Sequence, residues 1–271
     1  MSTRFLEVSE GKIAYDDLGS GPLVICVPSM GDLRSEYRFL APRLAAAGFR
    51  VVTLDVRGHG ESTTAWSDFS VSGIGSDLLA LISHLNAGPA IILGTSMAAG
   101  AAVWAAAEAP QQVRGMALID PFVRGESSWQ NRLLFGALFA RPWGAAVWQK
   151  YYNSLYPTRK PEDFTSYSAT LRANLQAPGR LEALQKMIAA SKAASEARLP
   201  RVSAPALVLM GSKDPDFKQP ESEARWLAEQ LHCRYTLIDG AGHYPHAEMP
   251  EITAPLIIDF LRQIAEATRV A

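Results

Sequence analysis

A single serine, Ser96, lies between a strand-like apolar run and an alanine-rich helix in the stretch AIILGTSMAAGAA, residues 90–102. A serine on a sharp strand-to-helix turn projects its hydroxyl above the sheet, where it can act as a nucleophile. Such a turn crowds the positions two before and two after the serine, and Gly94 and Ala98 are both small. Amides at the start of the helix, beginning with Met97, can bind a developing oxyanion. The alternative is that Ser96 serves only as a helix N-cap.

A nucleophilic serine requires a base, and three of the five histidines of the chain lie in predicted loops. His243 follows Gly-Ala-Gly, which we interpret as a flexible approach that lets the ring reach over the strand ends. His246 is the second candidate, three residues later and nearer a helix start. His59 lies between two glycines, which indicates a structural turn. The order of Ser96 followed much later by His243 favours His243 as the base.

An orienting carboxylate is expected between the serine and the histidine in the sequence. Asp214 lies in GSKDPDF directly after the apolar run ALVLMG, and Gly211 and Pro215 suit a turn that holds a carboxylate in place. Asp216 can act behind it or in the pocket, and Asp120, after the run MALI, is an alternative acid. Aspartates of this kind can also be ordinary turn formers. The turn residues favour Asp214.

Apolar periodicity predicts the elements that must position these side chains. Residues 4–19 indicate two strands that meet around Glu10-Gly11, and buried-strand patterns cover 22–28, 50–55, 90–93 and 113–119. Helical patterns cover 33–47, with Gly48 as the stop, as well as 74–85 and 97–109. Alternating strands and helices predict an α/β fold, with a mostly parallel twisted sheet and helices on both faces.

This alternation stops after Pro121 and resumes at the strand patterns 206–211 and 234–238, before a last helix around 251–267. Residues 124–204 contain helical stretches punctuated by prolines and no convincing strand. The sequence therefore predicts one α/β core, residues 1–123 and 205–271, interrupted by a helical insertion, residues 124–204.

Composition excludes several classes of function. The net charge of −1 gives no electrostatic basis for binding nucleic acid or an anionic membrane. Cys26 and Cys233 cannot form a disulfide framework, and no Cys/His spacing resembles a zinc site, so no metal is expected. The first residues do not resemble a signal peptide, and no apolar run approaches the ~20 residues that cross a bilayer. We expect a cytoplasmic protein with a small-molecule substrate; its oligomeric state stays open.

Five motifs in order resemble the α/β-hydrolase fold superfamily, in particular serine hydrolases with a helical cap. They are CVPSMGD (26–32), LDVRGHGES (54–62), GTSMA (94–98), GSKDPDF (211–217) and GAGHYPH (240–246). The resemblance covers nearly the whole chain, and it implies that residues 124–204 form a cap over the active site. It also implies an oxyanion hole formed by the backbone N–H groups of Met30 and Met97. Two positions depart from the pattern: Pro28-Ser29 replaces His-Gly in the oxyanion loop, and Ala98 replaces the second glycine of the elbow.

The resemblance implies hydrolysis through an acyl-enzyme, with Ser96 as nucleophile, His243 as base and Asp214 as orienting acid, and without a metal or organic cofactor. We expect a small to medium apolar ester, thioester or lactone as the substrate. Hydrolysis of a C–C bond and cofactor-free perhydrolase or haloperoxidase chemistry use the same triad. A ligand-binding receptor with residual hydrolase activity is an alternative of another class. Candidate pocket residues are Ser29, Trp129, Phe135, Phe139, Trp143, Trp148 and Tyr152.

Overall fold

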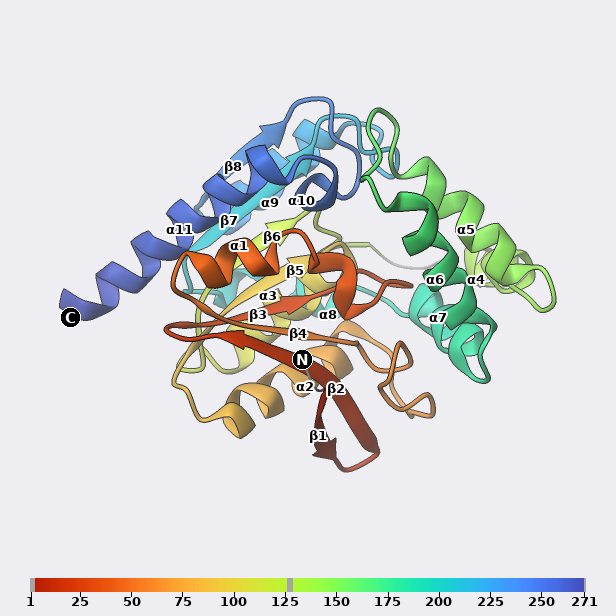
Figure 1. The fold of residues 1–271 in the computed structure, drawn as a ribbon, viewed down its shortest axis with the longest axis horizontal. Helices are drawn as coiled ribbons and strands as arrows, with labels where there is room; N and C mark the ends of the chain where they lie inside the picture. Colours follow the sequence, from red (N-terminus) through yellow and green to blue (C-terminus); the bar gives the residue numbers. More distant parts are fainter. Residues whose placement is uncertain (1–2, 126–128, 271) are drawn as a thin grey trace.

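The computed structural model of the chain describes residues 3–125 and 129–270. In these ranges an eight-stranded sheet runs in the order β1-β2-β4-β3-β5-β6-β7-β8 (Figure 1). Its strands are β1 (Arg4–Val8), β2 (Gly11–Gly19), β3 (Leu23–Val27), β4 (Arg50–Leu54), β5 (Ala90–Thr95), β6 (Val113–Ile119), β7 (Ala206–Gly211) and β8 (Arg234–Ile238). β2 is antiparallel to β1 and β4, and the other pairs are parallel. The predicted hairpin and the mostly parallel sheet are confirmed.

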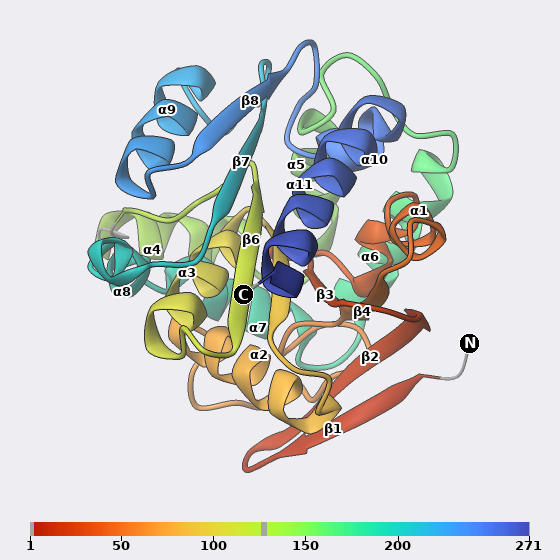
Figure 2. The same ribbon diagram turned by 90° about the vertical axis from the view of Figure 1, so that its left-hand side faces the viewer.

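Helices cover both faces of the sheet (Figure 2). On one face lie α1 (Ala41–Ala46) and α11 (Pro250–Val270), and on the other lie α2 (Val71–Leu85), α3 (Met97–Glu108) and α9 (Pro220–Gln230). Side chains of β3 alternate between the two cores: Val24 and Cys26 pack with α1 and α11, whereas Ile25 packs with the other group. A parallel strand buried on both faces has this continuous apolar sequence. Within the described ranges, no helix combines the length and apolar character needed to span a bilayer.

The helical character predicted for residues 33–47 is confirmed, but it is divided between two elements. A 3-10 helix (Arg34–Tyr37) comes first, and α1 starts only at Ala41. Pro42 lies in the first turn of α1, where its missing backbone N–H has no partner to lose, so it suits the start of a helix better than the interior. Gly48, with φ of 93°, follows the end of α1, as predicted.

Between β6 and β7 the described residues form helices and no strand. They are α4 (Trp129–Leu138), α5 (Gly144–Ser154), α6 (Phe164–Gln176), α7 (Arg180–Ala189), α8 (Ala193–Glu196) and a 3-10 helix (Leu199–Arg201). Figure 1 shows α4–α7 grouped at one end of the molecule, where α5 packs against α6 and α7 packs against α4 and α6. Two apolar clusters hold them, one around Tyr152 and Tyr156 and one around Trp148 and Leu181.

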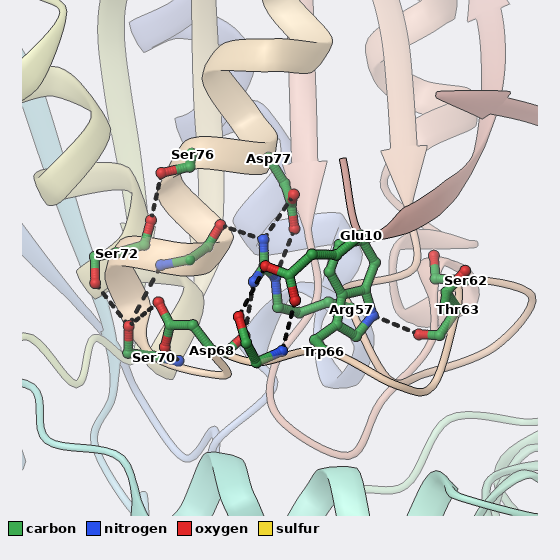
Figure 3. A network of polar contacts seen from close by, with 12 residues as sticks. Glu10, Arg57, Ser62, Thr63, Trp66, Asp68, Ser70, Ser72, Ser76 and Asp77 are labelled. Atoms are coloured by element: carbon green, nitrogen blue, oxygen red, sulfur yellow. Dashed lines mark hydrogen bonds and ion pairs between the residues drawn. The ribbon is translucent and has the colours of Figure 1, made fainter. Parts of the chain in front are cut away.

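A buried polar network fixes the loop after β4 to α2 (Figure 3). The guanidinium of Arg57 donates to both carboxylate oxygens of Asp77 at 2.8 Å and to the carbonyl oxygen of Gly73 at 2.8 Å. Its charge also lies 4.5 Å from the ring centre of Trp66. Burying two charges costs free energy, and an ion pair offsets that cost only if further hydrogen bonds satisfy the charged groups, as they do here. The loop that carries His59 is therefore anchored at its base.

Candidate active site

Ser96 lies at the turn between β5 and α3 in a strained backbone conformation, with φ of 57° and ψ of −123°. Its amide donates to the carbonyl oxygen of Ile119 at 2.9 Å, and its carbonyl oxygen accepts from the amide of Phe122 at 3.0 Å. A Cβ on Gly94 would lie 2.7 Å from the carbonyl oxygen of Ala98, so the turn requires glycine there. Ser96 occupies the N-cap position of α3, but its side chain makes no capping hydrogen bond there.

His243 and Asp214 form a buried hydrogen-bonded pair, with 2.7 Å between Nδ1 and Oδ2. The second carboxylate oxygen of Asp214 accepts from the amide of Asp216 at 2.9 Å. Burial lowers the pKa of His243, but the charge and hydrogen bond of Asp214, assisted by the charge of Asp216, raise it to about 9. Burial raises the pKa of Asp214, while the charge and hydrogen bond of His243 hold it below its ordinary value. The pair thus favours the imidazolium–carboxylate state.

The other candidate base, His246, lies away from this pair. It follows the first residue of the short helix α10 (Pro245–Glu248), where its ring is fully buried and stacks on Tyr37 with 5.0 Å between the ring centres. Its Nε2 lies 3.1 Å from Oε1 of Glu36. His246 therefore packs against the 3-10 helix that contains Glu36 and Tyr37.

Asp120, the alternative acid, lies behind Asp214. Its Oδ1 accepts a hydrogen bond from the amide of Gly211 at 2.8 Å. Its Oδ2 is buried and has no hydrogen-bond partner among the described residues when Asp120 and Asp214 are both charged. Burial and the charge of Asp214 raise the pKa of Asp120 well above its ordinary value. A protonated Asp120 can donate to Asp214. Ligand atoms of these two carboxyls and of His243 lie within 4.8 Å of one another, a grouping that could suit a metal. However, Nδ1 of His243 and Oδ2 of Asp214 are already hydrogen-bonded to each other.

A cavity of about 340 Å³ opens beside Ser96. Asp216 lines it, with its Oδ2 3.9 Å from Nδ1 of His243 and 2.6 Å from the hydroxyl of Tyr151, which donates to it. Phe122, also in the lining, has its ring centre 6.0 Å from that of His243 while its amide binds the Ser96 carbonyl. Ser96, His243 and the cavity therefore share one rim of the sheet.

The predicted oxyanion loop is held from both sides. The amide of Ser29 donates to Glu36 Oε2 at 2.7 Å, and the amide of Gly31 donates to Nε2 of His59 at 3.2 Å. Burial lowers the pKa of His59 to about 4, so its ring is neutral and Nε2 can accept. In the described part of the chain the amides of Met30 and Met97 have no protein partner, and both residues line the cavity beside Ser96. Glu36 is not among the residues that the sequence predicts for the site, and the glycines beside His59 predict only a structural turn.

The predicted pocket residues divide into two groups. Phe135, Phe139 and Trp148 line the cavity. Trp143 does not, because its side chain is 53% exposed and its Nε1 donates to the carbonyl oxygen of Ala137. Tyr152 packs in the aromatic cluster with Tyr156, and the two hydroxyls are 2.8 Å apart. The Ser29 hydroxyl shares a buried hydrogen bond of 2.7 Å with Tyr244. The side chain of Trp129 lies outside the described residues.

Comparisons with known proteins agree with this architecture. The dihydrolipoyllysine-residue acetyltransferase component of an acetoin cleaving system from Pseudomonas putida is 30% identical over 253 residues, 90% of this chain but 64% of that relative's length. The 3-oxoadipate enol-lactonase 2 of Acinetobacter baylyi is 26% identical over 205 residues, 74% of each chain. The crystal structure of bromoperoxidase from Bacillus anthracis shares the fold, with a TM-score of 0.83 at 18% identity over 96% of this chain and 100% of that one. The family model for the alpha/beta hydrolase fold matches residues 22–250, and the chain belongs to that family.

Proposed function

We propose that this protein is a serine hydrolase that cleaves a small to medium ester, thioester or lactone of apolar character through an acyl-enzyme. The observation that carries the proposal is the buried His243–Asp214 hydrogen bond at the same rim as Ser96, whose hydroxyl is free of any capping bond. Family membership supports a hydrolase. A matched relative is named an enol-lactonase, which supports the lactone within this substrate class.

In the proposed first step, Oγ of Ser96 attacks the substrate carbonyl while Nε2 of neutral His243 takes its proton. Asp214 accepts the Nδ1–H hydrogen bond, which fixes the tautomer with Nε2 free and stabilises the imidazolium that forms. His243 then gives the proton to the leaving oxygen or sulfur, and the acyl group stays on Ser96. In the second step His243 takes a proton from water, the hydroxide displaces Ser96 from the acyl group, and the serine recovers its proton.

The amides of Met30 and Met97 are the proposed donors to the oxyanion of both tetrahedral intermediates. Their neighbours support this role, because Glu36 and His59 bind the amides of Ser29 and Gly31 on either side of Met30. The loop therefore has little freedom to turn away. Pre-oriented donors cost no reorganisation during the reaction, and removal of one typically costs ~3 kcal/mol of transition-state stabilisation.

Labelling with a fluorophosphonate probe and turnover of p-nitrophenyl esters test the proposal. Wild type is expected to label at Ser96 and to hydrolyse acetate to octanoate esters, and Ser96→Ala to abolish labelling and lower kcat at least about a thousandfold. Ser168→Ala is the matched control, because it removes another buried serine hydroxyl, which lies in α6 and accepts a hydrogen bond from Gln149 of α5. Turnover that persists in Ser96→Ala would overturn the proposal. Stoichiometric labelling without turnover of any ester would instead favour the ligand receptor.

A further inference from the structure

Lys192 is the one cationic residue in the described lining of the cavity beside Ser96, which is otherwise largely apolar. Lys192 lies between α7 and α8, and its Nζ is 5.7 Å from the ring centre of Phe122. Its side chain shares the lining with Ile188 and Phe135. A cation in such surroundings costs free energy unless an anion or several acceptors compensate it.

No protein group supplies that anion among the described residues, since Lys192 forms no ion pair or side-chain hydrogen bond there. The other charged group in the described lining, Asp216, is already bonded to Tyr151 at 2.6 Å and lies 3.9 Å from His243. Burial is the cause that lowers the pKa of Lys192, whereas a neighbouring carboxylate would raise it. Lys192, which is partly exposed, therefore has no anionic partner among the described residues.

The backbone of Lys192 is fixed rather than loose. Its amide donates to the carbonyl oxygen of Gly125 at 3.2 Å, and its carbonyl oxygen accepts from the hydroxyl of Ser195 at 2.9 Å. Ser195 in turn packs on α3, because a Cβ on Gly100 would lie 2.9 Å from its Oγ. Gly100 follows Ser96 by one turn of the same helix. Ser96 and the backbone of Lys192 are therefore both held by α3. A residue that selects the substrate needs such a fixed position relative to the nucleophile.

We propose that Lys192 binds a carboxylate of the substrate, placed away from the bond that is cleaved, so that the preferred substrates are anionic esters or lactones such as half-esters of dicarboxylic acids. The inference rests on the proposed function and narrows its substrate class. Charge-assisted hydrogen bonds are stronger than neutral ones, and they can select one substrate from its neutral analogue. The apolar lining would hold the carbon chain between the carboxylate and the carbonyl.

Two ester pairs test the inference, one for each side of the bond. The first compares mono-p-nitrophenyl adipate with p-nitrophenyl hexanoate, and the second compares 4-carboxyphenyl butanoate with phenyl butanoate. Wild type is expected to prefer the carboxylate member of at least one pair, and Lys192→Met to reduce that preference at least about tenfold, the range of one hydrogen bond to a charged group. The change is expected mainly in KM, because the contact is present before and during the reaction.

Lys186→Met is the matched control. It removes another lysine from the same part of the chain, on α7, whose Nζ lies 5.2 Å from the ring centre of Phe69 and outside the cavity. This variant should keep the wild-type preference, and Lys192→Arg should keep part of it. Lys192→Gln replaces Lys192→Met if the latter does not fold.

Binding separates failure of this inference from failure of the proposed function. Titration calorimetry on Ser96→Ala with monomethyl adipate and methyl hexanoate needs no turnover. The acid ester should bind more tightly, and the double variant with Lys192→Met should lose that advantage. If neutral esters are turned over through Ser96 but neither assay depends on Lys192, the carboxylate site is refuted and the hydrolase stands. If no ester is turned over but the binding advantage depends on Lys192, the hydrolase is refuted and the carboxylate site stands.

Discussion

Asp216 offers a sharp test of the proposed base, because it carries a second negative charge close to His243 without bonding to it. Its Oδ2 lies 3.9 Å from Nδ1, compared with 2.7 Å for Asp214. The charge of Asp216 helps to raise the pKa of His243. Asp216→Asn keeps the shape of the side chain and removes the charge. The pKa of His243 is therefore expected to fall in this variant.

The size of the fall follows from the separation. Two unit charges about 4 Å apart interact by about 1 kcal/mol in water and by about 4 kcal/mol at an effective dielectric constant of 20. At about 1.36 kcal/mol per unit, these limits correspond to a pKa shift of about 0.8 to 3 units. Since only neutral His243 can accept the proton of Ser96, activity rises with pH through this pKa, which is about 9 in the wild type. The variant should reach its plateau at lower pH.

The assay is the pH profile of kcat/KM from pH 6 to 10, which reports the free enzyme, on p-nitrophenyl butanoate with the spontaneous rate subtracted. Tyr151→Phe is the matched control, because it removes the hydroxyl that donates to Asp216 but leaves the carboxylate in place. Its rising limb should stay close to that of the wild type. A limb that does not move in Asp216→Asn would refute the assignment of that limb to His243, or the electrostatic contact itself.

Two further substitutions test the supports of the site. Gly94→Ala places a Cβ 2.7 Å from the carbonyl oxygen of Ala98, so unfolding in urea should show a loss of about 1–3 kcal/mol, with reduced fluorophosphonate labelling of Ser96; Ala98→Gly adds no atoms and should keep the labelling. His59→Gln should reduce the acid sensitivity of folding. The pKa of His59 is about 4 in the folded state and 6.5 in its ordinary state, so the unfolded chain takes up the proton first as pH falls, and stability is lost between these values. From pH 7.5 to 5, wild type should lose about 2 kcal/mol more than the variant; equal losses would contradict a neutral buried His59.

Local sequence patterns were sufficient for the strands and for the residues at their ends. Ser96 and Asp214 each follow a short continuous apolar run that is typical of a buried strand, and the carboxyl ends of parallel strands meet at one rim. Their proximity was therefore implicit in the order of the elements. Asp214 follows β7 and His243 follows β8, so the pairing of these two adjacent strands brings the two side chains together.

The pocket could not be predicted in the same way, because it depends on how helices of one segment pack on each other. Trp143 and Trp148 are five residues apart and chemically identical, yet one is 53% exposed and the other is 3% exposed and lines the cavity. Lys192 carried no motif, and its position follows from the packing of the neighbouring Ser195 on α3, which the local sequence does not encode. Glu36 was hidden for the same reason, as it binds the oxyanion loop from a neighbouring 3-10 helix.

The glycines around His243 reveal a link between the insertion and the proposed catalytic groups. The expectation of a flexible Gly-Ala-Gly approach is wrong: a Cβ on Gly242 would lie 2.2 Å from the carbonyl oxygen of Leu155, and that oxygen accepts from the amide of His243 at 3.0 Å. Glycine is needed there because the backbone comes from α5 at close range. Gly31 in the oxyanion loop likewise gives room to Trp148 of α5, whose ring would meet a Cβ at 2.2 Å. One helix of the insertion thus touches both the loop of the base and the loop of the oxyanion donor. Because these contacts are close, α5 and the residue that follows it help to fix the positions of both loops.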